Sequence, residues 1–519
     1  MSKIRKSGIL LHPTSLPSDY CLGDFGEEAY RFMDTLAKTN QTLWQILPLS
    51  PVDDFGSPYQ SLSAFAGETL LISLKELVND GYLTHLDLPA PISNSHIDIS
   101  KARSIKAPLF KLAFENFQTQ NKSDDYISFC KENNFWLEDY TLFSALKKYF
   151  LQHPSNNPSN QHQHLAYTKN TFWELFPPAL RKHIPSEMRI WKSRLAKEIE
   201  EQAFLQFIFH KQWKKIKNYA NQHNIKIIGD IPIFISFDSA DVWANQSLFL
   251  LDENMLPTGV AGVPPDYFSE KGQLWGNPLY RWEAHKSNNY LWWTARLRHA
   301  LAYADMLRID HFRGFASYWE IPFGATNATA GTWRKSVGKD FFLSLKKEFP
   351  DLPFIAEDLG CLSADVHKLR QRTGLPGMRI LQFAFDGDKN NDYLPYMYNE
   401  NTVVYTGTHD NNTTLGWYNE ASEEERDFFR RYMNTDGQNP AWDAIRLAFS
   451  SAASMAIIPL QDVLALDGTH RMNTPGIAQG NWSFSFHWDM WLDWQKDGLI
   501  YLSDLFGRNQ KKKEDAAKE

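Results

Sequence analysis

Eight short apolar runs recur along the chain, and they constrain its fold more than any other feature. Each run is continuous rather than alternating, as expected for parallel strands covered on both faces. Helical patterns separate several of them; one, Ala364–Thr373, ends at a glycine that can stop a helix. The runs span 8–12, 43–48, 225–230, 306–310, 353–357, 378–383, 402–406 and 455–460. This pattern predicts an α/β fold, a (β/α)8 TIM barrel with large insertions.

The spacing of the runs predicts the domain organisation. A polar, helix-rich gap separates the second and third runs, and we interpret it as an inserted helical subdomain. A stretch rich in Gly, Pro and aromatic residues follows the third run and is expected to form substrate-covering loops. After the eighth run too little chain remains for a C-terminal β-sandwich. The expected parts are 1–65 (strands one and two), 66–193 (helical subdomain), 194–233 (helix and strand three), 234–289 (inserted loops), 290–506 (strands four to eight) and 507–519 (disordered tail).

Composition excludes several classes of protein. The net charge of -7 and the absence of a basic stripe argue against nucleic acid as a partner. No run reaches the roughly 18 apolar residues that a membrane helix needs, so no membrane association is expected. Three widely spaced cysteines predict neither disulfides nor a zinc site, and the apolar run near the start is too short for a signal peptide. A cytoplasmic protein is the expectation, and the oligomeric state stays undetermined.

Aromatic residues make up 14% of the chain, including 18 Trp and 21 Tyr. Many must belong to the core. A surplus of Trp and Tyr nevertheless suits carbohydrate, because sugar C–H faces stack on aromatic rings while hydroxyls bond to polar groups at the rim.

Acidic residues gather at the ends of the predicted strands. In a barrel the active site lies at the carboxyl ends of the strands, and these ends carry Asp230, Asp310, Glu357 and Asp410. One Asp after a strand is usually a helix cap or turn residue. Four acidic ends facing one barrel mouth indicate a catalytic site instead, with Arg308 offsetting part of their repulsion.

Two of these acids could supply the pair of carboxyl groups that glycoside cleavage needs. Such cleavage uses one carboxyl group to attack or stabilise the sugar cation and another to protonate the leaving oxygen. Asp310 and Glu357 lie about one βα unit apart and are expected on adjacent strands. Arg308, two residues before Asp310, points to the same side of its strand and can hold Asp310 ionised.

An ordered set of motifs then resembles one family. The motifs are Gly8-Ile-Leu-Leu-His-Pro-Thr-Ser-Leu-Pro17, Ser57-Pro-Tyr-Gln-Ser61, Gly229-Asp-Ile-Pro-Ile233, Leu307-Arg-Ile-Asp-His-Phe-Arg-Gly314, Ala356-Glu-Asp-Leu-Gly360, Thr406-Gly-Thr-His-Asp-Asn411 and Arg471-Met-Asn-Thr-Pro-Gly476. In these motifs the chain is similar to the 4-α-glucanotransferases, the amylomaltase or disproportionating-enzyme family (glycoside hydrolase family 77), from Gly8 to about Leu505.

The resemblance implies a retaining double displacement that moves a segment of a 1,4-α-D-glucan to the 4-hydroxyl of another glucan or of glucose. It implies that Asp310 is the nucleophile, Glu357 the acid and then the base, and Asp410 the ligand of the 2- and 3-hydroxyls of the sugar. The implied partners are maltooligosaccharides and linear α-glucans, with no metal and no cofactor. The implied substrate contacts are Arg308, His311, His409, Asp230, Tyr59, Ser57, Tyr267, Phe268, Trp275, Asn277 and Asn473.

Less specific interpretations stay open for some of these residues. His311, His409 and Phe268 could be core residues. Asn412 stands where many relatives are expected to carry Asp, and Ser483–Phe486 stands where relatives often have an Arg, which leaves subsite details open.

Three other functions compete with glucan transfer. An α-amylase-like retaining hydrolase would use the same acids, and only its products would distinguish it. A metal-dependent barrel hydrolase usually has paired histidines on strand one, whereas here His12 is followed by Pro13 and Thr14. A non-catalytic glucan-binding protein would not need Asp310 and Glu357 together.

Overall fold

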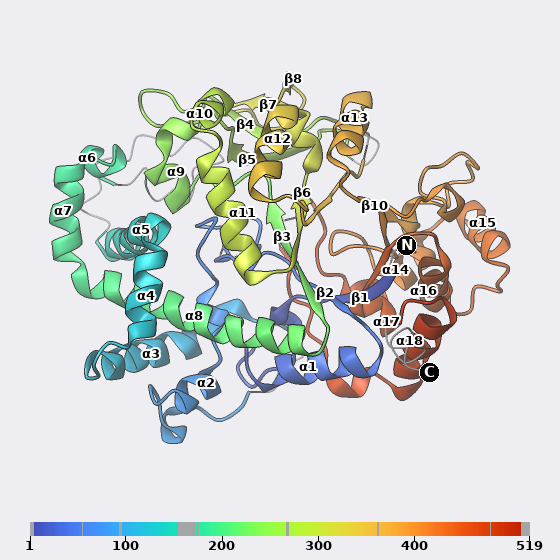
Figure 1. Cartoon of the computed structure of the whole chain (residues 1–519), viewed down its shortest axis with the longest axis horizontal. Helices are drawn as coiled ribbons and strands as arrows, with labels where there is room; N and C mark the ends of the chain where they lie inside the picture. The colour runs from blue at the N-terminus through green and yellow to red at the C-terminus, as the bar shows by residue number, and fades with distance from the viewer. Residues whose placement is uncertain are drawn as a thin grey trace.

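The computed structural model describes residues 5–53, 55–92, 96–153, 173, 176–265, 269–360, 363–477 and 479–509. Eight parallel strands close into a barrel at its centre (Figure 1), and each falls within or overlaps one of the eight apolar runs, so the predicted (β/α)8 fold is confirmed. In order around the barrel they are β1 (Lys6–Leu10), β2 (Leu43–Gln45), β3 (Lys226–Pro232), β6 (Met306–Asp310), β9 (Phe354–Ala356), β10 (Gly377–Ile380), β11 (Thr402–Tyr405) and β12 (Met455–Pro459).

Helices cover the outside of the barrel because each presents an apolar stripe to it. The longest, α8 (Ala196–Gln222), buries Phe209, Trp213 and Ile216 at helical spacing. The Trp213 ring lies 6.1 Å from that of Trp44 on β2, so α8 packs on the barrel wall. The other barrel helices are α1 (Glu27–Lys38), α11 (Leu291–Tyr303), α12 (Gly338–Glu348), α13 (Ala364–Thr373) and α16 (Pro440–Ser450).

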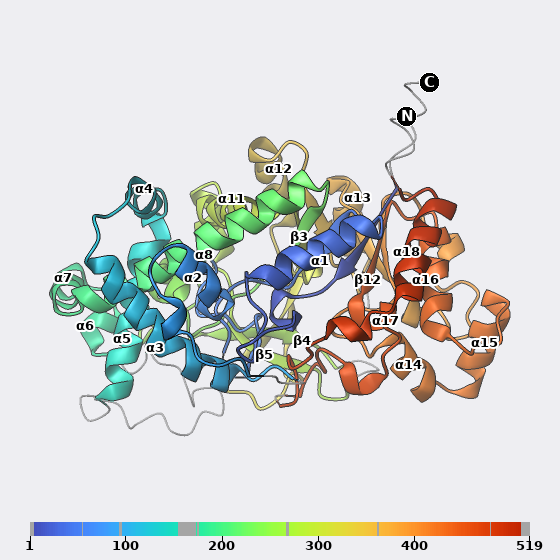
Figure 2. The same ribbon diagram turned by 90° about the horizontal axis from the view of Figure 1, so that it is seen from below.

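Between β2 and β3 the chain forms a group of helices at one end of the molecule (Figures 1 and 2). Buried Lys106 fastens this group to the barrel, donating to the carbonyls of Leu70 and Ile72 and to the carboxylate of Asp24. All three N–H donors of the buried Lys106 ammonium therefore have an acceptor. The helices are α2 (Leu74–Asn79), α3 (Ile99–Gln118), α4 (Asp124–Glu132), α5 (Asn134–Gln152), α6 (Pro178–Arg181) and α7 (Pro185–Arg194).

Two excursions combine into a second sheet above the barrel, in the order β5-β4-β7-β8 with antiparallel neighbours. The segment after β3 supplies β4 (Gly259–Val263) and β5 (Gln273–Pro278), together with α9 (Ala240–Ala244) and α10 (Trp282–Ser287). The segment after β6 supplies β7 (Ser317–Pro322) and β8 (Thr332–Lys335). The aromatic excursion expected after strand three is thus half of a sheet.

The C-terminal part packs on the side of the barrel opposite the helical group (Figure 1), through α14 (Thr414–Glu420), α15 (Glu423–Met433), α17 (Leu460–Val463) and α18 (Asp493–Leu505). From Leu460 to Asn509, apart from residue 478, the chain forms helices and turns but no strand. Residues 510–519, most of the expected tail, lie outside the described residues. None of the helices in the described part of the chain has the length and apolar character needed to cross a bilayer.

Close contact between the first two strands makes Gly8 a sensitive position. A Cβ added there would lie 2.2 Å from the Leu43 carbonyl oxygen, which is backbone and cannot move aside. We expect Gly8→Ala to lower the free energy of unfolding by about 1–3 kcal/mol, measured by urea denaturation.

Gly229→Ala on β3 is the matched control. Its added Cβ would lie 3.0 Å from the Ala304 Cβ and the Leu307 Cδ2, with the nearest backbone atom, the Met306 oxygen, at 3.8 Å, so the crowding is milder than at Gly8. Equal losses of stability in the two variants would contradict the expectation.

Candidate active site

Strand register brings the predicted acids together. On the neighbouring strands β3 and β6, Asp230 pairs with Arg308, and on β6 and β9, Ile309 pairs with Ala356. The amide of Glu357 then donates to the carbonyl of Ile309 at 3.0 Å. Asp310 and Glu357 therefore leave adjacent strands side by side, at the carboxyl end of the barrel.

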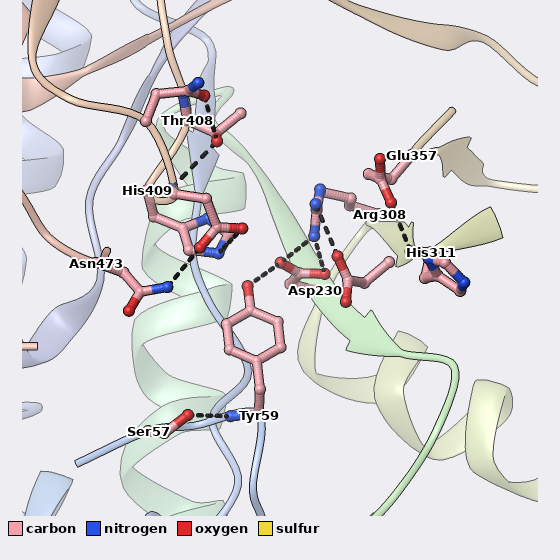
Figure 3. Close-up of polar contacts among 12 residues, drawn as sticks. Ser57, Tyr59, Asp230, Arg308, His311, Glu357, Thr408, His409 and Asn473 are labelled. Carbon is pink, nitrogen blue, oxygen red and sulfur yellow. Dashed lines mark hydrogen bonds and ion pairs between the residues drawn. The ribbon is translucent and has the colours of Figure 1, made fainter. Parts of the chain in front are cut away.

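Arg308 lies between two carboxylates (Figure 3). Its Nη1 donates to both carboxylate oxygens of Asp230, at 2.9 and 2.7 Å, and its Nη2 lies 2.8 Å from Oδ1 of Asp310. Burial by itself lowers the pKa of this guanidinium, but Asp230 and Asp310 outweigh that effect and raise it well above its usual value. The arginine is therefore a permanent cation beneath the site.

Exposure separates these groups into two layers. The side chains of Arg308 and Asp230 are 3% and 0% exposed, whereas those of Asp310 and Asp410 are 27% and 41% exposed. The ion pair of Arg308 with Asp230 thus forms a buried floor, and the two more exposed carboxylates can meet a ligand.

Backbone amides hold Glu357. Its two carboxyl oxygens accept from the amide of His311 at 2.7 Å and from that of Leu359 at 2.9 Å. Burial raises the pKa of Glu357 and of Asp310, and Arg308 opposes the rise in both; the two amides also oppose it in Glu357. The guanidinium contacts Asp310 directly, which favours the ionised form of that carboxylate.

His311 adopts a left-handed backbone conformation, with φ of 53°. This conformation is uncommon for a residue with a side chain, and it aims the amide of His311 at Glu357. Burial lowers the pKa of its ring to about 3, so the ring is neutral at pH 7. The Trp275 ring on β5 meets it edge-on at 4.8 Å, which brings the second sheet next to the residue that follows β6.

The loop after β11 presents Asp410. Asn473 Nδ2 donates to Asp410 Oδ1 at 2.6 Å, and His409 Nε2 lies 3.3 Å from Oδ2. Burial lowers the pKa of His409, which favours the neutral ring, so this contact is not an ion pair between two full charges. Each oxygen of the Asp410 carboxylate therefore has a neighbour, from Asn473 on one side and His409 on the other.

Tyr59 links the two halves of the site. Its hydroxyl donates to Asp230 at 2.7 Å, and its ring stacks on His409 with centroids 5.2 Å apart and planes 9° apart. Trp482 contacts both rings, at 5.9 and 6.0 Å. Ser57 Oγ accepts from the amide of Tyr59 and so shapes the turn that carries it.

The structure joins most of the predicted site residues into this one network. Trp275 reaches it through His311, and Asn277 lies buried near the end of β5. Tyr267 and Phe268 lie outside the described residues. The sequence analysis does not assign Trp482 or Arg471 to the site. Arg471 could have been found, because it is the first residue of the motif Arg471–Gly476.

No cluster of three or more His, Cys, Asp or Glu side chains with a geometry suited to a metal ion occurs in the part of the chain that the structure describes. The four acids at the strand ends meet an arginine, backbone amides and an asparagine instead.

Comparison with known proteins places this site in a family. A family model described as 4-alpha-glucanotransferase matches residues 11–490. The chain is 44% identical to the 4-alpha-glucanotransferase of a Synechocystis strain, over 97% of this chain and 98% of that protein. It is 43% identical to that of Thermus thermophilus, over 92% and 94%. The amylomaltase from Streptococcus agalactiae, solved in complex with acarbose, superimposes with a TM-score of 0.91 at 34% identity, covering 98% of this chain and 100% of that one. The chain belongs to the 4-alpha-glucanotransferase family.

Proposed function

We propose that this chain moves a segment of a 1,4-α-D-glucan to the 4-hydroxyl of another glucan or of glucose, by a retaining double displacement. One observation carries the proposal. Asp310 and Glu357 leave adjacent strands, one ion-paired to a buried arginine and the other held by backbone amides. Two carboxyl groups in such different environments suit the two roles that glycoside cleavage needs.

In the first step Asp310 attacks the anomeric carbon and Glu357 gives its proton to the glycosidic oxygen. The bond to the leaving glucan breaks, and the remaining segment is held on Asp310 as a β-linked ester. In the second step the 4-hydroxyl of an acceptor attacks the anomeric carbon of that ester, the bond to Asp310 breaks, and Glu357 takes the proton of the hydroxyl. The configuration at the anomeric carbon is therefore retained after two inversions.

Asp410 is proposed to bind the 2- and 3-hydroxyls of the sugar that carries the reacting carbon. Its carboxylate is more exposed than that of Asp310, and its two oxygens are contacted by Asn473 and His409. Hydrogen bonds to the 2-hydroxyl that strengthen as the ring flattens stabilise the transition state more than the bound substrate. His409, His311 and Asp230 complete the polar lining.

Transfer requires that an acceptor sugar, and not water, meets the ester. We propose that the second sheet supplies this cover, since Trp275 on β5 packs against His311 beside Asp310. A ring at that place can stack on an acceptor sugar and exclude water. We propose the same role for Tyr267 and Phe268 and polar substrate contacts for Asn277 and Asn473. The helical insertion, residues 66–193, is the second candidate for such a cover.

The proposal predicts disproportionation of a short maltooligosaccharide. Incubated with maltotriose, the protein should yield glucose and a ladder of longer chains while total reducing ends stay constant, because each cut is followed by a new bond. Chromatography of the products with a reducing-end assay measures both. Rising reducing ends without longer products would make the protein a hydrolase, and no reaction would favour a glucan-binding protein.

Glu357→Gln tests the proton donor. An acid catalyst works in its protonated form, so activity is lost as pH rises through its pKa, which burial raises. We expect kcat for maltotriose to fall about 10²- to 10⁴-fold and the basic limb of the pH profile to disappear.

Glu68→Gln is the matched control, because buried Glu68 also accepts from two backbone amides, those of Val52 and Leu70, and burial likewise raises its pKa. This variant should keep the kcat and the basic limb of the unmodified protein. A basic limb that persists unchanged in Glu357→Gln would assign the proton to another group.

A further inference from the structure

The loop 407–413, which carries His409 and Asp410, is fastened at its two ends by a buried carboxylate. Asp462, just after β12, accepts from the hydroxyl of Thr406 at 2.5 Å, where β11 ends. It also accepts from the amide and hydroxyl of Thr414, at 2.6 and 2.7 Å, where α14 begins. Asp462 fixes where the loop starts and stops, but it does not touch the loop's tip.

Arg471 holds the tip. Its Nη2 donates to the backbone carbonyl of Asp410 at 2.6 Å, and its Nε donates to the backbone carbonyl of Asn473 at 2.7 Å. Asn473 in turn donates through its side chain to the Asp410 carboxylate at 2.6 Å. The three residues form a closed triangle of hydrogen bonds that joins two separate loops of the site.

We infer that Arg471 is a positioning residue for the reaction: it sets the place and angle of the Asp410 carboxylate without itself meeting the sugar. A guanidinium suits this task because its planar fork reaches two carbonyls in fixed directions. This inference rests on the proposed function. Arg471 connects the backbones of Asp410 and Asn473, so that the two residues keep a fixed position relative to each other.

Asp462 and Arg471 hold different parts of the loop 407–413. With Asp462 in place the loop keeps its ends, so loss of Arg471 frees only the tip that carries Asp410. A carboxylate displaced by a fraction of an ångström still allows the outer sugars of a glucan to bind. It weakens hydrogen bonds that matter most in the transition state, so kcat falls more than substrate binding does.

The test compares Arg471→Met with Arg5→Met in maltotriose disproportionation. Arg5 also donates to backbone carbonyls, those of Phe449, Ser451 and Phe506, but it lies at the opposite end of the barrel. We expect Arg471→Met to lower kcat about 100-fold and to change KM less than about threefold. Arg5→Met should lower the melting temperature and leave kcat within about twofold of the unmodified protein.

A double mutant distinguishes positioning from a general structural role. If Arg471 acts through Asp410, adding Arg471→Met to Asp410→Asn should lower kcat no more than about threefold further. Arg471→Lys, which keeps the charge but reaches one carbonyl at a time, should give an intermediate kcat and serves where Arg471→Met does not fold.

Three results would overturn the inference: an Arg471→Met enzyme with unchanged kcat, a loss confined to KM, or losses that multiply in the double mutant. The unmodified protein is assayed alongside. If it does not disproportionate maltotriose, the proposed function fails; if it does and Arg471→Met is as active, only the role of Arg471 fails.

Discussion

The site depends on one buried guanidinium. Arg308 is almost completely shielded from water, and such a charge is costly to bury unless its partners satisfy it. Asp230 meets it with two hydrogen bonds and Asp310 with an ion pair, and Tyr59 completes the shell of Asp230. A lysine could not reach both carboxylates in these directions, because its ammonium is a point charge without a fork. The register of β3, β6 and β9 places the acidic side chains close together. The positive charge of Arg308 offsets the repulsion between Asp230 and Asp310.

The chemistry then follows from how each acid is held. Asp310 faces the cation, which favours its ionised form, whereas in Glu357 removal from water raises the pKa against the opposing effects of Arg308 and two backbone amides. One functional group, the carboxyl, in two environments suits the two proposed roles of nucleophile and acid. Asp410 is held differently again, by an asparagine and a neutral imidazole on loops rather than strands. It is the acid whose position depends most on the loops around it, which is why Arg471 matters.

Much of this could be predicted from the sequence. A buried parallel strand is a continuous apolar run, so each barrel strand and the acid at its end can be identified from one short stretch of sequence. The second sheet was not, because β4 is a short glycine-containing strand and its partner β7 lies beyond β6 in the chain. The hydrogen bond from Asn473 to Asp410 and the packing of Trp482 on Tyr59 were also out of reach, since they depend on how distant loops meet.

The order of the chain has a consequence for how the protein is made. Tyr59 comes near the beginning, and its ring stacks on His409, while Asp410 is completed by Asn473 still later. The barrel itself closes only when β12 pairs with β1. During synthesis the three acids therefore emerge long before the contacts that orient them all exist. A growing chain that stops before Asn473 carries Asp310 and Glu357 but not the assembled site, so the site is complete only after Asn473 has been synthesised.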